Sequence, residues 1–140
     1  MPKRILIADD DEDLRRMIRW FLKLRTTYEV CGEAVNGVDA IEKARTLNPD
    51  LILLDYSMPA MNGIETGAVL KAMLPEVPVI LFTNQDTSSL ESAAISVGIR
   101  AVVPKTDMGK LAGYLDTLLY GNSENAGTPR QEPVRASNPG

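Results

Sequence analysis

The sequence contains no histidine and only one cysteine, Cys31, among its 140 residues. Without histidine the chain has no Ser–His or Cys–His pair for nucleophilic catalysis. A zinc site is also disfavoured, because carboxylate oxygens alone prefer magnesium, manganese or calcium. One cysteine forms no internal disulfide, and this predicts a reducing, cytoplasmic location.

Long apolar runs and an excess of basic charge are missing as well. No segment is apolar over the roughly 18 residues that a membrane-spanning helix needs, and no secretion signal is recognisable. The formal net charge of −4 argues against direct binding of nucleic acid or of an anionic membrane. No glycine-rich P-loop is present for nucleotide binding.

What the sequence does contain is an alternation of strand-like and helix-like segments over residues 3–120. Apolar runs at 5–8, 51–54 and 79–82 lack polar alternation, which is typical of strands buried on both faces. Two further strands are predicted at 28–33 and 100–103, the second at a sheet edge because Pro104 follows it. The pattern predicts an α/β, flavodoxin-like fold. It has a five-stranded parallel sheet of order 2-1-3-4-5 and five helices on both faces.

The last twenty residues differ in composition from the rest. Residues 121–140 are polar and contain Pro129, Pro133 and Pro139. Few of them offer apolar surface to bury, so a disordered tail or linker is predicted there.

Carboxylates follow two of the apolar runs directly. Asp9 and Asp10 follow the first run, and Asp55 follows the run at 51–54. The carboxyl ends of parallel strands form the usual ligand site of such sheets, and carboxylates gathered there repel one another unless a cation joins them. This predicts a divalent metal site. Thr83 and Lys105 end the last two strands, and together these groups suit a phosphoryl ligand.

With these motifs the sequence resembles the receiver domain of response regulators in bacterial two-component signalling. The motifs are Ile5–Asp10, Leu51–Pro59 with Gly63, Leu81–Thr83, and Lys105, in the family's order over residues 3 to about 119. The resemblance implies a receiver domain at 3–120. It also implies a signalling phosphoacceptor that is not an enzyme.

The resemblance further implies a role for each matching residue. Asp55 would accept a phosphoryl group from a sensor histidine kinase or a histidine phosphotransfer protein. Asp10, Asp55 and the backbone carbonyl of Ser57 would ligate Mg²⁺, and Asp9 would act through a water molecule. Thr83 would donate a hydrogen bond to the phosphoryl group.

Lys105 would pair with one of the phosphoryl oxygens. The signal would then pass to a second receiver or to an effector of unknown identity, with no direct contact to nucleic acid or membrane.

Three features depart from the family or modify its site. Val102 stands where the family usually has the Tyr or Phe that turns inward on activation. In this sequence a proline, Pro104, precedes Lys105. The family commonly has a proline directly after this lysine, joined to it by a cis peptide bond. A cis Lys105–Thr106 bond would cost about 2.5–4 kcal/mol, so a trans bond is expected. Ser57 and Gln85 stand at positions that line the phosphoryl pocket in the family.

Simpler interpretations exist for the same residues. Asp9, Asp10 and Asp11 also suit the acidic first turn of a helix, and for Asp11 a helix cap is the preferred interpretation. Taken alone, Thr83 is a turn former and Lys105 a surface lysine. The arginines of the first helix, Arg15, Arg16 and Arg19, are interpreted as a solvated face.

Two other functions compete with phosphoryl acceptance. The first is a pseudo-receiver, an interaction module that does not depend on phosphorylation, and Val102 is its motive. The second is a metal-dependent phosphatase, suggested by the spacing of Asp9 and Asp11. The threonine that should continue such a motif is missing, and no cap domain is evident.

Overall fold

The structure is a computed structural model that describes residues 2–121. The strands are β1 (Arg4–Ala8), β2 (Glu29–Ala34), β3 (Leu51–Leu54), β4 (Val79–Thr83) and β5 (Ala101–Pro104). The helices are α1 (Glu12–Arg25), α2 (Gly37–Leu47), α3 (Gly63–Met73), α4 (Thr87–Ser96), α5 (Met108–Asp116) and a π-helical turn, η1 (Thr117–Gly121). The predicted tail at 121–140 lies, apart from its first residue, outside the described residues.

The chain divides into two units, residues 1–108 and 109–140. The first contains the whole sheet and α1–α4, and the second contains most of α5 together with η1. All residues of the predicted site belong to the first unit.

The sheet confirms the predicted topology. Its five strands are parallel and run in the order β2-β1-β3-β4-β5. Ala8 of β1 lies opposite Leu54 of β3, so these two strands end at the same level. Pro104 is the last residue of the edge strand β5 and lies opposite Thr83, a place where a missing backbone N–H is tolerated.

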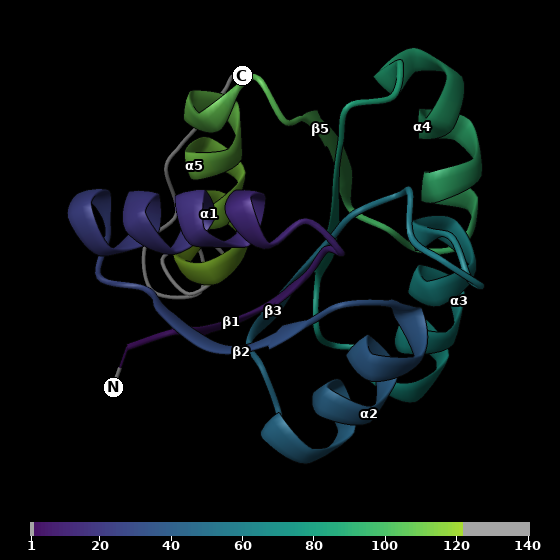
Figure 1. Ribbon diagram of the computed structural model, residues 1–140, viewed down its shortest axis with the longest axis horizontal. Helices are drawn as coiled ribbons and strands as arrows, with labels where there is room; N and C mark the ends of the chain where they lie inside the picture. Colours follow the sequence, from purple (N-terminus) through teal and green to yellow (C-terminus); the bar gives the residue numbers. More distant parts are fainter. Residues whose placement is uncertain (1, 122–140) are drawn as a thin grey trace. The chain divides into compact units, whose positions relative to one another are not determined.

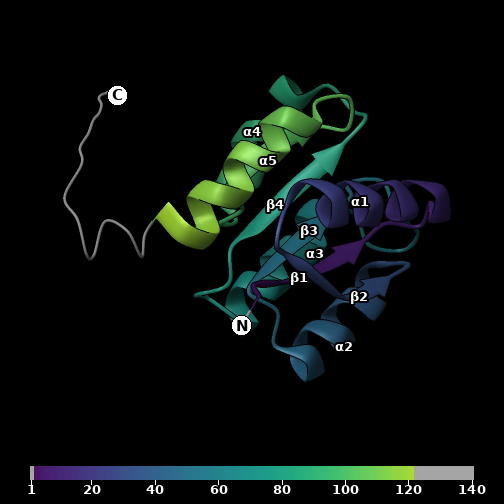
Figure 2. The same ribbon diagram turned by 90° about the vertical axis from the view of Figure 1, so that its left-hand side faces the viewer.

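Helices of the first unit cover both faces of the sheet. Figure 1 shows α1 on one side of β1 and β3, with α2 and α3 on the other, and Figure 2 shows the same layers from the side. Side chains alternate between faces along a strand. Leu6, Ile52 and Leu54 therefore share one core with residues of α2, α3 and α4: Ala40, Ala44, Leu70, Leu90 and Ala94.

The strand boundaries differ from the predicted ones by no more than one residue. β2 begins at Glu29, because the backbone N–H of Tyr28 is bound by the Thr26 hydroxyl at 3.0 Å. α4 ends at Ser96, two residues before Gly98. Gly98 takes a positive φ of 96° there, which a glycine adopts without strain.

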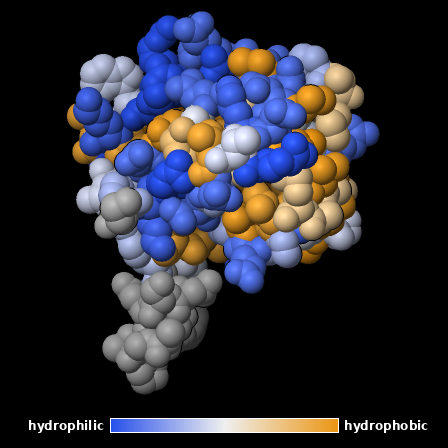
Figure 3. Space-filling model, turned by 90° about the horizontal axis from the view of Figure 1, so that it is seen from below, coloured by the Kyte–Doolittle hydropathy of each residue, from blue (hydrophilic) through white to orange (hydrophobic). Residues whose placement is uncertain are grey.

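The surface mixes polar and apolar residues. On the face drawn in Figure 3, hydrophobic residues come to the surface in several places between hydrophilic ones. Isolated exposed apolar residues are ordinary on soluble domains. None of the described helices is both long enough and apolar enough to cross a membrane.

Candidate functional site

The two acidic motifs meet because β1 and β3 are neighbours in the sheet. The backbone N–H of Asp55 donates to the carbonyl of Ala8 at 2.9 Å, and that of Asp9 donates to Ala34 at 3.0 Å. These bonds continue the parallel hydrogen-bonding pattern of the sheet for one residue beyond the ends of β1 and β3. Asp9 and Asp55 are therefore fixed side by side at the carboxyl edge.

Three carboxylates gather at this point. Oxygens of Asp9, Asp10 and Asp55 all lie within 4.8 Å of one another. Asp9 and Asp55 are 2% and 4% exposed, whereas Asp10 faces solvent. Buried carboxylates this close repel one another, and an all-oxygen donor set is the kind that Mg²⁺ prefers. The residues present therefore fit a magnesium ion.

Lys105 supplies a positive charge between the two buried carboxylates. Its Nζ lies 2.8 Å from Oδ2 of Asp9 and 3.2 Å from Oδ1 of Asp55. Burial alone would lower the pKa of Lys105, but the hydrogen bond and charge of Asp9, joined by those of Asp55, raise it above its usual value. The ammonium group is therefore firmly charged, and the surface-lysine interpretation is wrong.

The electrostatic balance is least favourable at Asp55. Burial, and then the neighbouring charge of Asp9, raise the pKa of Asp55 from 3.8 to about 6, although Lys105 opposes both effects. A backbone hydrogen bond from Ser57 also favours the charged form. A perturbed carboxylate of this kind at a strand end indicates a functional site.

Asp11 takes a different role from its neighbours. Its Oδ1 accepts hydrogen bonds from the backbone N–H groups of Asp13 and Leu14, at 3.0 and 3.4 Å. It is the N-cap of α1, as the sequence predicts. Its own N–H donates to Oδ1 of Asp9 at 2.8 Å, so the start of the helix also orients Asp9.

Thr83 lies at the same edge, at the end of β4. It is 1% exposed, and its carbonyl accepts the backbone N–H of Lys105 at 2.9 Å. Its hydroxyl oxygen accepts from the N–H of Gln85 at 3.0 Å, so the loop after β4 does form a turn. Within residues 2–121 this hydroxyl makes no hydrogen bond to Asp9, Asp10 or Asp55, which leaves its proton for another acceptor.

Ser57 and Gln85 come from the loops after β3 and β4. Nε2 of Gln85 lies 3.4 Å from the hydroxyl of Ser57, which joins the two loops. Gly63 approaches the loop after β3 so closely that a Cβ would stand 2.3 Å from the carbonyl oxygen of Asp55. Only glycine fits there without moving the loop that carries Asp55.

Arg15 contradicts the interpretation of the first-helix arginines as a solvated face. Its side chain is only 11% exposed and donates to the carbonyl of Asp9 at 2.7 Å and to Glu33 at 2.8 Å. In the sequence it follows Leu14, at the border of the apolar stripe. That border position is the only local signal that it points inward.

The expected trans geometry around Lys105 is confirmed. No cis peptide bond occurs among residues 2–121. Val102 is buried in β5 at 4% exposure, so its position belongs to the core.

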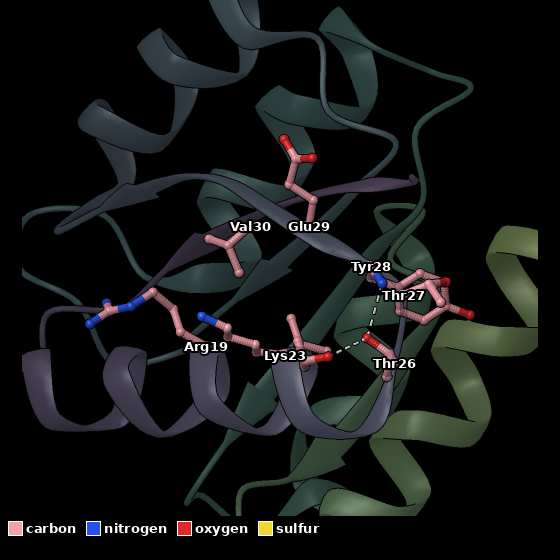
Figure 4. A pocket seen from close by; sticks show the side chains of 8 residues that line it. Arg19, Lys23, Thr26, Thr27, Tyr28, Glu29 and Val30 are labelled. Atoms are coloured by element: carbon pink, nitrogen blue, oxygen red, sulfur yellow. Dashed lines mark hydrogen bonds between the residues drawn. The ribbon is translucent and has the colours of Figure 1, made fainter. Parts of the chain in front are cut away.

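A hollow of about 410 Å³ lies elsewhere, between the last turns of α1 and the start of β2 (Figure 4). Its lining includes Arg19, Lys23, Thr26 and Glu29. Glu29 begins β2 and lies opposite Arg4, the first residue of β1. The hollow is therefore at the amino edge of these strands, away from the carboxylates.

Comparisons with known proteins identify a family whose members are similar to this chain in sequence and in fold. The family described as response regulator receiver domain matches residues 5–116. The response regulator protein VraR of Staphylococcus saprophyticus is 37% identical over 106 residues, which make up 76% of this chain and 51% of that protein. The chain thus spans about half the length of that relative.

Shorter relatives and solved structures agree. The chemotaxis protein CheY of Thermotoga maritima is 34% identical over 105 residues, covering 75% of this chain and 87% of that protein. A two-component response regulator of the LuxR family from Aurantimonas superposes with a TM-score of 0.81 at 25% identity, over 86% of this chain and 87% of that one.

A CheY-like receiver domain from Methanospirillum hungatei, 23% identical with a TM-score of 0.77, shares the fold; 89% of this chain and 99% of that one are covered. Receiver domains act in phosphorelay signalling, and Mg²⁺ binding and aspartate phosphorylation are general for them. Because the family match spans most of the residues and relatives above 30% identity agree with it, this chain belongs to the response regulator receiver domain family.

Proposed function

We propose that Asp55 accepts a phosphoryl group, in the presence of Mg²⁺, from a phosphohistidine of a sensor kinase or a histidine phosphotransfer protein. The observation that carries the proposal is the Lys105 ammonium group lying between Asp9 and Asp55, with Asp10 beside them. This arrangement gathers a nucleophile, a cation and metal ligands at one point. Phosphoryl transfer depends mainly on such positioning and charge neutralisation.

Asp55 is the nucleophile in this proposal. With a pKa of about 6 it is mostly ionised at neutral pH. Its carboxylate oxygen bonds to phosphorus while the phosphorus–nitrogen bond of the donor breaks, and the electron pair stays on the departing imidazole. The backbone hydrogen bond from Ser57 helps to hold the carboxylate for this attack.

The remaining groups of the site bind the cation and neutralise the charge of the phosphoryl group. Asp9, Asp10, Asp55 and the backbone carbonyl of Ser57 would hold the Mg²⁺. When bound, Mg²⁺ supplies positive charge against the phosphoryl oxygens. Lys105 gives up its contact with Asp55 and pairs with one phosphoryl oxygen.

Thr83 donates its unused hydroxyl proton to another phosphoryl oxygen. The phosphorylated surface then changes its binding to a second receiver or to an effector protein.

Incubation of the chain with Mg²⁺ and acetyl phosphate tests the proposal. Intact-mass spectrometry should show the addition of one phosphoryl group, which Asp55→Asn abolishes and EDTA prevents. Glu91→Gln, an exposed change on α4, serves as the matched control and should still be modified. An unmodified wild-type chain, folded by circular dichroism and also inert toward its cognate kinase, would contradict the proposal.

A further inference from the structure

We infer that Arg15 is a positioning residue for the metal site: it fixes the backbone of the acidic loop and is itself anchored by Glu33. This inference rests on the proposed function. Nη1 of Arg15 donates to the carbonyl oxygen of Asp9 at 2.7 Å. Its Nε donates to Oε1 of Glu33 at 2.8 Å. One guanidinium group thus joins the acidic loop to strand β2.

The carbonyl of Asp9 belongs to the peptide unit that joins Asp9 to Asp10. A peptide unit is planar, so holding its oxygen also sets the direction in which the chain enters Asp10. The side chain of Asp10 makes no hydrogen bond or ion pair with other described residues, and it is exposed. Its approach to Asp9 and Asp55 therefore depends on the backbone that Arg15 holds.

Glu33 in turn is firmly anchored. It lies in β2 opposite Ile7 of β1, and its backbone carbonyl accepts a hydrogen bond from Lys43. Its carboxylate takes Nε of Arg15 on one oxygen and Nη1 of Arg19 on the other. Charge-assisted bonds of this kind are short and directional, so Glu33 fixes where the Arg15 guanidinium lies.

Arg19 provides a matched control. It comes from the same helix and binds the same carboxylate, yet it makes no contact with Asp9. Its side chain is 41% exposed, against 11% for Arg15, and Figure 4 shows its guanidinium group directed away from the Thr26 and Glu29 side of the hollow. If Arg15 only linked α1 to β2, loss of either arginine would have the same effect on the metal site. A different effect of the two losses therefore indicates the contact of Arg15 with Asp9.

The test is Mg²⁺ affinity, measured by isothermal titration calorimetry on the full chain well below its unfolding temperature. Arg15→Met should raise the Kd about tenfold, the usual effect of removing a partner that orients a metal ligand. Arg15→Lys should raise it about threefold, because one ammonium group does not replace a two-armed donor. Arg19→Met should leave the Kd within about twofold, whatever it does to the melting temperature.

A second measurement needs no metal. In the metal-free chain, the amide resonance of Asp10 should broaden in Arg15→Met and stay sharp in Arg19→Met, since only the first variant frees the peptide unit that joins Asp9 to Asp10. The amide of Asp9 should stay sharp in both variants, because the carbonyl of Ala34 accepts it. An Arg15→Met Kd within twofold of wild type would overturn the inference, and so would equal losses in both arginine variants. Failure of the wild-type chain to bind Mg²⁺ would instead overturn the proposed function, and this inference with it.

Discussion

The carboxyl and amino edges of the strands β1, β2 and β3 both carry charged residues, but only at the carboxyl edge are these charges buried. At the carboxyl edge, Asp9 and Asp55 are almost fully buried around the ammonium group of Lys105. At the amino edge, the lining of the hollow includes the exposed side chains of Lys23 and Glu29 and the hydroxyl group of Thr26, which bonds to the carbonyl of Leu22. Buried charge that its neighbours balance incompletely is a better indicator of a functional site than the size of a hollow is.

The largest expected difference between the edges comes from removing a lysine at each. Lys105→Met leaves two buried carboxylates without their cation, which should lower the free energy of unfolding at pH 7 by more than about 3 kcal/mol. Lys23→Met, at the hollow, should change it by no more than about 0.5 kcal/mol. Urea denaturation monitored by circular dichroism measures both. Equal effects would mean that the two edges do not differ in this way.

A pH series should sharpen the comparison. The pKa of Asp55 is raised from 3.8 to about 6 in the folded chain. The folded state therefore binds this proton more tightly than the unfolded state, and stability falls as pH rises from about 4 through about 6. In metal-free buffer, Asp55→Asn should be more stable than wild type by about 3 kcal/mol at pH 7, with the gap closing near pH 4. A gap that stays constant with pH would contradict the assignment to Asp55.

Mg²⁺ should act on the carboxyl edge alone. A ligand that binds only the folded state at a hundredfold excess over its Kd stabilises by about 2.7 kcal/mol, which thermal unfolding detects as a higher Tm. Asp10→Asn should lose most of this gain, because Asp10 is exposed and contributes chiefly a carboxylate. Glu29→Gln, an exposed carboxylate lost at the hollow, should keep it. If Glu29→Gln lost the gain instead, the metal would bind elsewhere.

The sequence predicts the fold well because the signals are local. Uninterrupted apolar runs identify the buried strands, and Pro104 places β5 at an edge, so the strand order follows. The acidic cluster is predictable for the same reason: Asp9, Asp10 and Asp55 each follow a strand directly, and parallel strands bring their ends together.

What supports the cluster is not predictable from local patterns. Arg15 and Glu33 are 18 residues apart, and their contact depends on how α1 packs against β2. A helical pattern tells only that Arg15 borders the apolar stripe. The contact between Nε2 of Gln85 and the hydroxyl of Ser57 likewise depends on how the loops after β3 and β4 approach each other.

The smallest predicted effect tests whether the hollow is merely structural. The Thr26 hydroxyl donates to the carbonyl of Leu22 at 2.7 Å and accepts the N–H of Tyr28 at 3.0 Å, turning the chain from α1 toward β2. Thr26→Val keeps the shape and removes both bonds, while the Leu22 carbonyl keeps the Thr26 backbone N–H. Stability should fall by about 1 kcal/mol, and the Kd for Mg²⁺ should not change. A weakened Mg²⁺ affinity in this variant would show that the two edges are coupled through α1, and the contrast between them would then be one of degree.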